Sequence, residues 1–267
     1  MRPGHSFEDT SVAGFYAHRP EYPRQIFDKL IEISPGRSSL LDLGCGTGKI
    51  VRGLAPHFAS VTGLDASREM LRVAQAQPTR SVHNITWICG LAETAELTGE
   101  PFDLVVAAAS IHWMDHAVVF PRLRAAVGPE HVFAVVDGDG AFEPPWQDAW
   151  DRFLERWIFE LKGEAYEPRN PNSSFATHMS RYRDWVGVAG ELEVVSDPIA
   201  QSVDGFIACQ HSRETFAPSK LGVRMREFDE ELARILQPYE ENGTLTYTVK
   251  TRLTWGSILP RPRQCPG

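Results

Sequence analysis

The residues with the clearest chemical potential form the segment LLDLGCGTG, which spans residues 40–48. It contains Asp42, followed by glycines at every second position, Gly44, Gly46 and Gly48. Glycine tolerates positive φ angles and lets a ligand approach the backbone without a Cβ in the way. A helix that begins directly behind the glycines also presents unpaired N–H groups to that ligand. The segment therefore predicts a ligand-binding turn between a strand and a helix.

The spacing of these glycines excludes two common nucleotide motifs. Counting from Gly44, the sixth residue is Lys49, so the G-x-G-x-x-G pattern of dinucleotide sites fails, and G-x-x-x-x-G-K-[ST] is absent as well. What remains is D-x-G-x-G-x-G, with a second acid, Asp65, at the end of the next predicted strand. A carboxylate there can accept hydrogen bonds from both hydroxyls of a ribose. An adenosine with a zwitterionic amino-acid tail, rather than a pyrophosphate, accounts for both acids and the tight loop.

The elements that must position these residues alternate between strand and helix up to Asp137. Helical periodicity or capping signals, including Ser67 as an N-cap, indicate helices at 21–33, 47–58, directly after Ser67 and at 116–127. Short apolar runs predict strands at 39–44, 60–65, 84–89, 102–109 and 131–137. Strands that are apolar on both faces and separated by helices imply a doubly wound, parallel sheet.

The pattern changes after Asp137. Residues 145–161 predict a helix rich in tryptophan, and a short helix is expected near Tyr182. A strand at 191–196, an amphipathic helix at 221–237 and a long alternating strand at 243–255 follow. The last strand is of the kind that suits an antiparallel edge. The middle third of the chain therefore predicts a cap laid over an α/β core.

Composition narrows the class of protein. Lys and Arg total 27 and Asp and Glu total 35, so the net charge is −8, which argues against a protein that coats nucleic acid. The four cysteines are widely spaced without a C-x-x-C pair, so a zinc ribbon or a dense disulfide framework is not expected. No apolar stretch is long enough to span a membrane, and the N-terminus lacks the apolar core of a secretory signal. We expect a cytoplasmic protein with no metal, nucleic-acid or membrane partner.

The chain from about residue 16 to residue 137 resembles the class I S-adenosylmethionine-dependent methyltransferases. LLDLGCGTG is similar to the first motif of that family and VTGLDASREML to its second. GLAETAEL resembles the segment after the third strand, and FDLVVAAASIHWMD the fourth-strand motif. The sequence FYAHRPEYP is similar to the small-molecule branch, and ASIHW to its trans-aconitate methyltransferase-like proteins.

The resemblance implies a fold and a division of the chain. The fold is α/β, with a doubly wound, seven-stranded and mostly parallel sheet and a helical cap insertion. Residues 1–36 would form an N-terminal helical segment over the active site, and residues 37–140 the cofactor-binding core. Residues 141–190 would form the cap, and residues 191–267 would complete the sheet and add helices.

The resemblance also implies S-adenosylmethionine as cofactor and a role for each matching residue. Gly44, Cys45, Gly46 and Gly48 would lie along its methionine and ribose. Asp42 would hold the ammonium group, partly through water, and Asp65 would bind the ribose hydroxyls. The expected adenine contacts are Ala66, Met70, Leu91, Ala92 and Glu93, and Ala109 would lie beside the methionine tail. Many relatives carry an acid at the position of Leu91, so the contact to the adenine amino group falls here to backbone groups or to Glu93.

The sequence says less about the residues that would bind the methyl acceptor, and each candidate could also have a purely structural role. His112 and Trp113 follow the fourth strand, at the edge where ligands bind in open α/β sheets, and His112 is a candidate general base. The second catalytic candidate is Tyr16. Trp146, with Trp150 and Trp157, forms one helical face, which is typical of a core and whose edge could close a substrate pocket. The substrate candidates are His18, Trp113, Trp146 and His211. His211 and the nearby Arg213 could reach the pocket, but the pattern favours ordinary residues at a helix end.

These patterns favour methyl transfer to a small molecule by in-line displacement, with oxygen, nitrogen and carbon acceptors all open. One alternative is a catalytically silent partner subunit that only binds S-adenosylmethionine. A nicotinamide-dependent oxidoreductase is disfavoured, because its glycine fingerprint is absent. The oligomeric state and the pathway are open.

Overall fold

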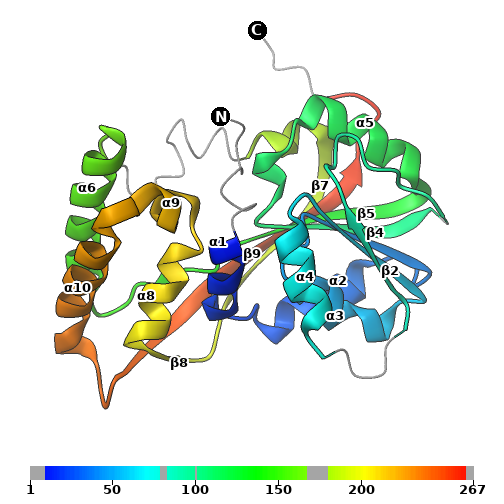
Figure 1. Ribbon diagram of the computed structural model, residues 1–267. Coiled ribbons are helices and arrows are strands. Elements are labelled where there is room, and N and C mark those ends of the chain that lie inside the picture. Colours follow the sequence, from blue (N-terminus) through cyan, green and yellow to red (C-terminus); the bar gives the residue numbers. More distant parts are fainter. Residues whose placement is uncertain (1–9, 79–82, 100, 167–179, 263–267) are drawn as a thin grey trace, which may run out of the picture. The chain divides into compact units, whose positions relative to one another are not determined.

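The computed structural model describes residues 10–78, 83–99, 101–166 and 180–262 (Figure 1). The chain folds into two units, each assembled from three separate stretches of sequence. The α/β unit comprises Tyr22–Gly138, Ser174–Val194 and Thr251–Gly267. The helical unit comprises Met1–Glu21, Asp139–Ser173 and Val195–Lys250. Residues 139 and 250 thus lie close to two of the points where the chain passes from one unit to the other.

The α/β unit contains the predicted seven-stranded sheet. Five parallel strands have the order β3-β2-β1-β4-β5, and the second half of β9 pairs with β5 in the antiparallel direction. The seventh strand, β7, pairs with β9. The bounds are Ser39–Leu43 (β1), Ser60–Asp65 (β2), Ile85–Cys89 (β3), Phe102–Ala108 (β4), Val127–Asp137 (β5), Val186–Val195 (β7) and Thr244–Ile258 (β9). The doubly wound, mostly parallel sheet is therefore confirmed.

The position of β9 within the sheet differs from the prediction. Its alternating sequence correctly indicated an antiparallel strand, but an edge position was wrong, because β9 lies between β5 and β7. Thr251 and Leu253 are fully buried as a result. The alternation of apolar and polar residues shows which side chains face each side of the sheet. It does not show whether the strand pairs with one neighbouring strand or with two.

Two apolar clusters cover the two faces of this sheet. Leu40 packs in one cluster with residues of α2 and α3, and its neighbour Leu41 packs in the other with residues of α5. Successive side chains of a strand point to opposite faces, so both faces of β1 must be covered. The helices are Arg24–Ile33 (α2), Lys49–Leu54 (α3), Arg68–Ala76 (α4) and His116–Ala126 (α5). The predicted N-cap is confirmed, since Ser67 Oγ accepts a hydrogen bond from the Met70 N–H at 3.2 Å.

The helical unit has an aromatic core. Trp146, Phe153, Trp157, Phe206 and Phe228 are all buried in it. The main helices are Thr10–Phe15 (α1), Gln147–Lys162 (α6), Val203–His211 (α8), Pro218–Leu221 (α9) and Met225–Leu236 (α10), and η2 (Tyr16–His18) is a short 3-10 helix. Two short strands, β6 (Ala141–Phe142) and β8 (Ile199–Ser202), pair with the first half of β9.

Some elements after residue 137 were predicted and others were not. The helices expected at 145–161 and 221–237 correspond to α6 and to α9 with α10. The short helix near Tyr182 is the 3-10 helix Arg181–Trp185 (η5), and it belongs to the α/β unit. The sequence patterns did not predict α8 or β8. Six of the nine residues of α8 are buried, so it has no polar stripe from which to recognise a helical period. No helix in the described part of the chain is long and apolar enough to cross a membrane.

The packing of β9 against β7 generates a stability prediction. A Cβ added to Gly256 would lie 2.2 Å from the backbone oxygen of Gly187, which cannot move without shifting β7. We expect G256A to lower the free energy of unfolding by roughly 1–3 kcal/mol, as overpacking does. The measurement is urea unfolding followed by circular dichroism. G128A is the matched control, because its added Cβ would lie 3.6 Å from the nearest atom. Equal stability of the two variants would contradict this packing.

Candidate functional site

The glycine segment forms a tight loop between β1 and α3. Gly44, Gly46 and Gly48 have φ angles of 72°, 52° and 79°, a region that other residues rarely adopt. The N–H groups of Gly44 and Cys45 both donate to the carbonyl oxygen of Leu64, at 2.8 and 3.0 Å. The predicted strand–turn–helix is therefore present, and its loop is tied to the end of β2.

Space around the loop also requires glycine. A Cβ on Gly44 would lie 2.5 Å from the Cβ of Ser110, and one on Gly48 would lie 2.6 Å from the Trp87 ring. Ser110 also donates its hydroxyl hydrogen bond to the carbonyl oxygen of Leu43. The loop is thus enclosed by Ser110, two residues after β4, and by the Trp87 side chain of β3. Neither Ser110 nor Trp87 was a predicted site residue, because their roles depend on the order of the strands.

The carboxylate of Asp65 is held at the end of β2 by the same loop. Its Oδ2 accepts a hydrogen bond from the Gly46 N–H and its Oδ1 one from the Ser67 N–H, both at 2.7 Å. Burial raises the pKa of Asp65 above its usual value, and these two hydrogen bonds lower it in part. A carboxylate has about four lone-pair positions, so two further donors can still be accepted. Asp65 is therefore oriented and able to bind a pair of hydroxyls.

Asp42 is the most unusual residue of the site. Its side chain is 1% exposed, and neither carboxylate oxygen has a hydrogen-bond partner of normal geometry among the residues that the structure describes. Burial first, and then the negative charge of Asp65, raise the pKa of Asp42 to about 8, while the Val51 N–H offsets part of the shift. A buried carboxyl group without a partner costs stability. The site therefore fits a ligand that brings a cationic hydrogen-bond donor to Asp42.

The remaining predicted cofactor residues lie after β2, β3 and β4. Ala66 is exposed, Met70 and Ala92 are buried, and Leu91 and Glu93 are half-buried. Glu93 Oε1 accepts a hydrogen bond from the Asp115 N–H at 2.9 Å, just before α5. Ala109 is a non-glycine residue at a φ of 50°, and its N–H donates to Val136 at 2.8 Å. Such strained positions cluster at functional sites.

His112 and Trp113 occupy a short 3-10 helix, η4 (Ile111–Trp113), directly behind Ala109. Both side chains are half-buried, and their rings are 4.6 Å apart at an angle of 50°. They belong to the α/β unit, as do the predicted cofactor residues. The carboxyl end of β4 thus carries a strained alanine, a histidine and a tryptophan in sequence.

The other acceptor-side candidates belong to the helical unit. The ring of Tyr16 lies 4.2 Å from the guanidinium carbon of Arg19, and His18 is exposed. Trp146 is 1% exposed and packs against Phe206 and Tyr247.

His211 is also buried in the helical unit, at 2% exposure. Its ring nitrogens lie 3.0 Å from the carbonyl oxygen of Phe216 and 2.8 Å from Oδ1 of Asp229. These partners hold the ring within the core of that unit. The roles of His211, Trp146, Tyr16 and His18 toward an acceptor stay predictions.

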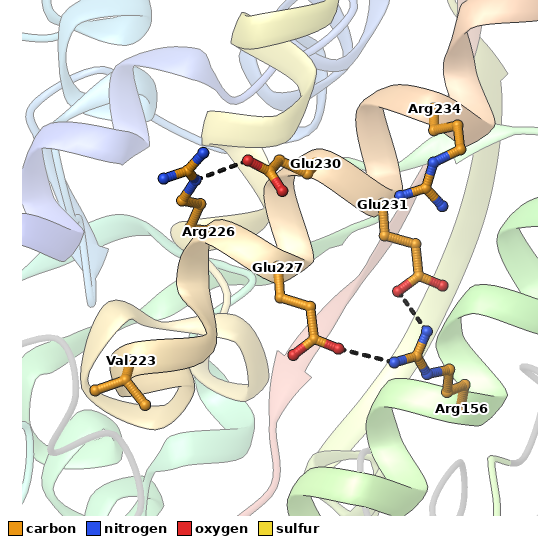
Figure 2. A pocket seen from close by; sticks show the side chains of 7 residues that line it. All are labelled: Arg156, Val223, Arg226, Glu227, Glu230, Glu231 and Arg234. Atoms are coloured by element: carbon orange, nitrogen blue, oxygen red, sulfur yellow. Dashed lines mark hydrogen bonds and ion pairs between the residues drawn. The ribbon is translucent and has the colours of Figure 1, made fainter.

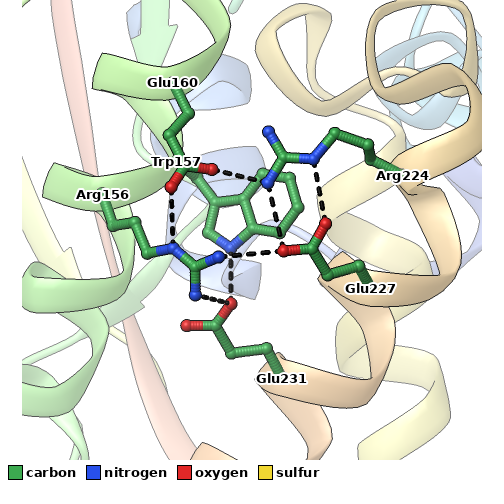
Figure 3. A network of polar contacts seen from close by, with 6 residues as sticks. All are labelled: Arg156, Trp157, Glu160, Arg224, Glu227 and Glu231. Carbon is green, nitrogen blue, oxygen red and sulfur yellow. Dashed lines mark hydrogen bonds and ion pairs between the residues drawn. The ribbon is translucent and has the colours of Figure 1, made fainter.

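A groove of about 490 Å³ lies between α6 and α10 of the helical unit, and charged side chains dominate its lining (Figure 2). Arg156 forms ion pairs with Glu160, Glu227 and Glu231 at 2.8–2.9 Å, and Figure 3 shows this network around the indole of Trp157. Trp157 Nε1 donates to Glu231 at 3.0 Å. Because its charges neutralise one another, this groove has the character of a salt-bridged helix contact.

The raised pKa of Asp42 predicts a pH dependence of stability in the ligand-free protein. Between the usual value of 3.8 and about 8, the folded state binds more protons than the unfolded state, so stability falls as the pH rises through that window. D42N removes this proton uptake. We therefore expect D42N to gain stability relative to the unmodified protein toward pH 8 and not near pH 4, measured by urea unfolding across this range. D28N, on the surface of α2, should leave the pH profile unchanged, and a D42N profile parallel to that of the unmodified protein would contradict the prediction.

The comparisons with known proteins agree on one family. Residues 40–130 match the family model described as a methyltransferase domain. The Saccharomyces cerevisiae protein CRG1, named as a probable S-adenosylmethionine-dependent methyltransferase, is 32% identical over 120 residues, which cover 43% of this chain and 41% of CRG1. Trans-aconitate 2-methyltransferase of Paracidovorax citrulli is 36% identical over 128 residues, covering 42% and 48% of the two chains. The chain spans about half the length of the curated relatives it matches.

The solved structures extend the likeness to almost the whole chain. A candidate type II methyltransferase from Anaeromyxobacter dehalogenans superposes with a TM-score of 0.66 and 25% identity, covering 91% of this chain and 99% of that one. The YcgJ protein of Bacillus subtilis shares the fold, with a TM-score of 0.50 and 17% identity over 91% of this chain and all of the other. With the sheet order, the glycine loop and the two acids, these matches identify residues 40–130 as a methyltransferase domain of the class I S-adenosylmethionine-dependent type.

Proposed function

We propose that this protein binds S-adenosylmethionine in its α/β unit and transfers the methyl group to a small-molecule acceptor. The observation that carries the proposal is the fully buried carboxyl group of Asp42, which has no partner of normal geometry among the described residues and lies behind a loop of three positive-φ glycines. S-adenosylmethionine carries an ammonium group, which is the kind of donor this carboxylate requires. An adjacent ammonium would favour the ionised form of Asp42 and lower its pKa.

The other cofactor contacts follow from the same loop. Asp65, already oriented by two backbone N–H groups, would accept hydrogen bonds from the ribose hydroxyls. The backbone of Gly44, Cys45, Gly46 and Gly48 would line the methionine and ribose. Residues that follow the strands would surround the adenine and the methionine tail, namely Ala66, Met70, Leu91, Ala92, Glu93 and Ala109. Because Glu93 already accepts from the Asp115 N–H, only its remaining lone pairs would serve the adenine.

Bound S-adenosylmethionine supplies an electrophilic methyl group, which an acceptor takes by in-line displacement. The protein contributes alignment, so neither a metal nor a nucleophilic side chain is needed from the chain. His112, half-buried beside Trp113, would remove a proton from an acceptor that must lose one. Tyr16 would assist on the acceptor side, and His18 and Trp113 would contact the acceptor. Trp146 and His211, both packed in the core of the helical unit, would support its acceptor-facing residues.

A small acceptor is supported by two observations. The net charge of −8 opposes the close approach of nucleic acid. The curated relative from Paracidovorax citrulli is named for a small molecule, trans-aconitate. The acceptor atom stays open at this level.

Cofactor binding can be tested with S-adenosylhomocysteine, the demethylated cofactor. At about 100 times the dissociation constant we expect it to stabilise the protein by about 2.7 kcal/mol, seen as a rise in Tm. D65N removes the charge that would hold the ribose, so its affinity should fall at least about tenfold. D28N on α2 is the matched control and should bind normally. No rise in Tm with millimolar ligand would rule out the cofactor assignment.

Methyl transfer itself requires a turnover assay. We expect label from methyl-labelled S-adenosylmethionine to appear in at least one member of a panel of small carboxylic acids, phenols and amines, with trans-aconitate included. H112Q should lower turnover by about 10²–10⁴-fold for an acceptor that loses a proton, without changing cofactor affinity. H57Q, at an exposed position, serves as its control. Cofactor binding without transfer to any member of the panel would favour a silent partner subunit.

A further inference from the structure

Two arginines of the helical unit share a single carboxylate. Arg19 and Arg213 both pair with Asp139, whose side chain is 11% exposed. We propose that Arg213 binds the negatively charged group, a carboxylate or a phosphate, of a small-molecule ligand. This anion site rests on the interactions around Arg213 within the helical unit and does not depend on the proposed function.

Arg19 neutralises Asp139, and its guanidinium is held by several contacts within the helical unit. Its Nη1 lies 2.8 Å from Oδ2 of Asp139, and its Nε and Nη2 donate to the hydroxyl and the carbonyl oxygen of Ser212 at 2.7 and 2.9 Å. Its guanidinium also stacks on the ring of Tyr16. Three polar contacts and a stacked ring at 12% exposure make Arg19 a fixed anchor of the N-terminal segment.

Arg213 is bound much more loosely to the same carboxylate. Its Nη1 is 3.5 Å from Oδ1 of Asp139, which is long for a charge-assisted hydrogen bond. Its Nε donates to Oε1 of Gln210 at 3.2 Å, the one hydrogen bond that the described residues show for its guanidinium. Arginine has five N–H donors. Since Arg19 already compensates Asp139, the positive charge of Arg213 is in excess at this place.

The guanidinium of Arg213 is accessible from solvent. The side chain of Arg213 is 28% exposed, so a solute can reach it. Gly140 lies beside it, and a Cβ there would be 3.6 Å from Nη2 of Arg213, so any longer side chain would compete for that space. A guanidinium fork matches the paired oxygens of a carboxylate or phosphate. A partly buried guanidinium that is only loosely paired and is accessible to solvent is therefore suited to a small anion.

The anion site is also connected to a predicted acceptor residue. Tyr16 stacks on Arg19, Arg19 pairs with Asp139, and Asp139 contacts Arg213, all within the helical unit. An anion held by Arg213 would thus lie on a cluster that also positions the Tyr16 ring. The site should select anions over cations, because the positive charge of Arg213 would repel a cationic ligand.

The experiment measures anion binding by calorimetry, with and without saturating S-adenosylhomocysteine. Citrate represents the carboxylates and glycerol 3-phosphate the phosphates. We expect at least one to bind the unmodified protein with a Kd of about 1 mM or below. R213Q should weaken that binding at least about tenfold, and R213K, which keeps the charge but loses the fork, should weaken it less. R24Q is the matched control, since the Arg24 side chain is 90% exposed.

The outcomes separate this inference from the proposed function. If S-adenosylhomocysteine binds but neither anion binds at about 10 mM, the anion site is refuted and the proposed function stands. Equal anion affinity in R213Q and the unmodified protein also refutes it, and if R213Q does not fold, R213M, which also removes the charge, is measured in its place. If anions bind through Arg213 but S-adenosylhomocysteine does not bind, the proposed function fails and the anion site stands. Preferential binding of citrate or of glycerol 3-phosphate identifies the class of anion.

Discussion

The buried carboxyl group of Asp42 is the constraint around which the α/β unit is organised. It lies near the carboxyl end of β1, between β2 and β4, where water cannot solvate it. Burial and the nearby charge of Asp65 raise its pKa to about 8, so near neutral pH the ligand-free site favours the protonated form. A protein that keeps an acid in such a place loses stability unless a ligand makes use of it. The glycine loop, the oriented Asp65 and the strained Ala109 all gather near this acid, at the carboxyl ends of the strands.

The two units carry different sets of the predicted site residues. The predicted cofactor residues lie in β1 and β2 and in the segments that follow β1, β2, β3 and β4, and all of them belong to the α/β unit. The helical unit collects residues that are far apart in sequence, such as Arg19, Asp139 and Arg213, into one charged cluster. A cofactor common to a family can be held by a local motif, whereas an acceptor that varies is better recognised by residues on a separate set of helices and loops.

Several expectations needed the structure before they could be judged. The strand at 243–255 was correctly expected to be antiparallel, but only its pairing with β7 shows that it is internal. His211 follows the predicted pattern of a residue at a helix end, and its bonds to Phe216 and Asp229 show that it is buried and fixed. Glu93 was expected at the adenine, and in the structure it also accepts a hydrogen bond from the Asp115 N–H, before α5. Each of these facts depends on a partner distant in the chain.

The sequence by itself determined the cofactor class and the doubly wound sheet. Both follow from local features: the glycine spacing after Asp42, Asp65 after the next strand, and apolar runs that alternate with helical periods. Only the tertiary structure decided the protonation of Asp42, the neighbours of β9, the enclosure of the loop by Ser110 and Trp87, and the unequal sharing of Asp139 by two arginines. The physical reason is that backbone preference and periodicity act over a few residues, whereas burial, charge and hydrogen-bond partners depend on which distant segments are brought together.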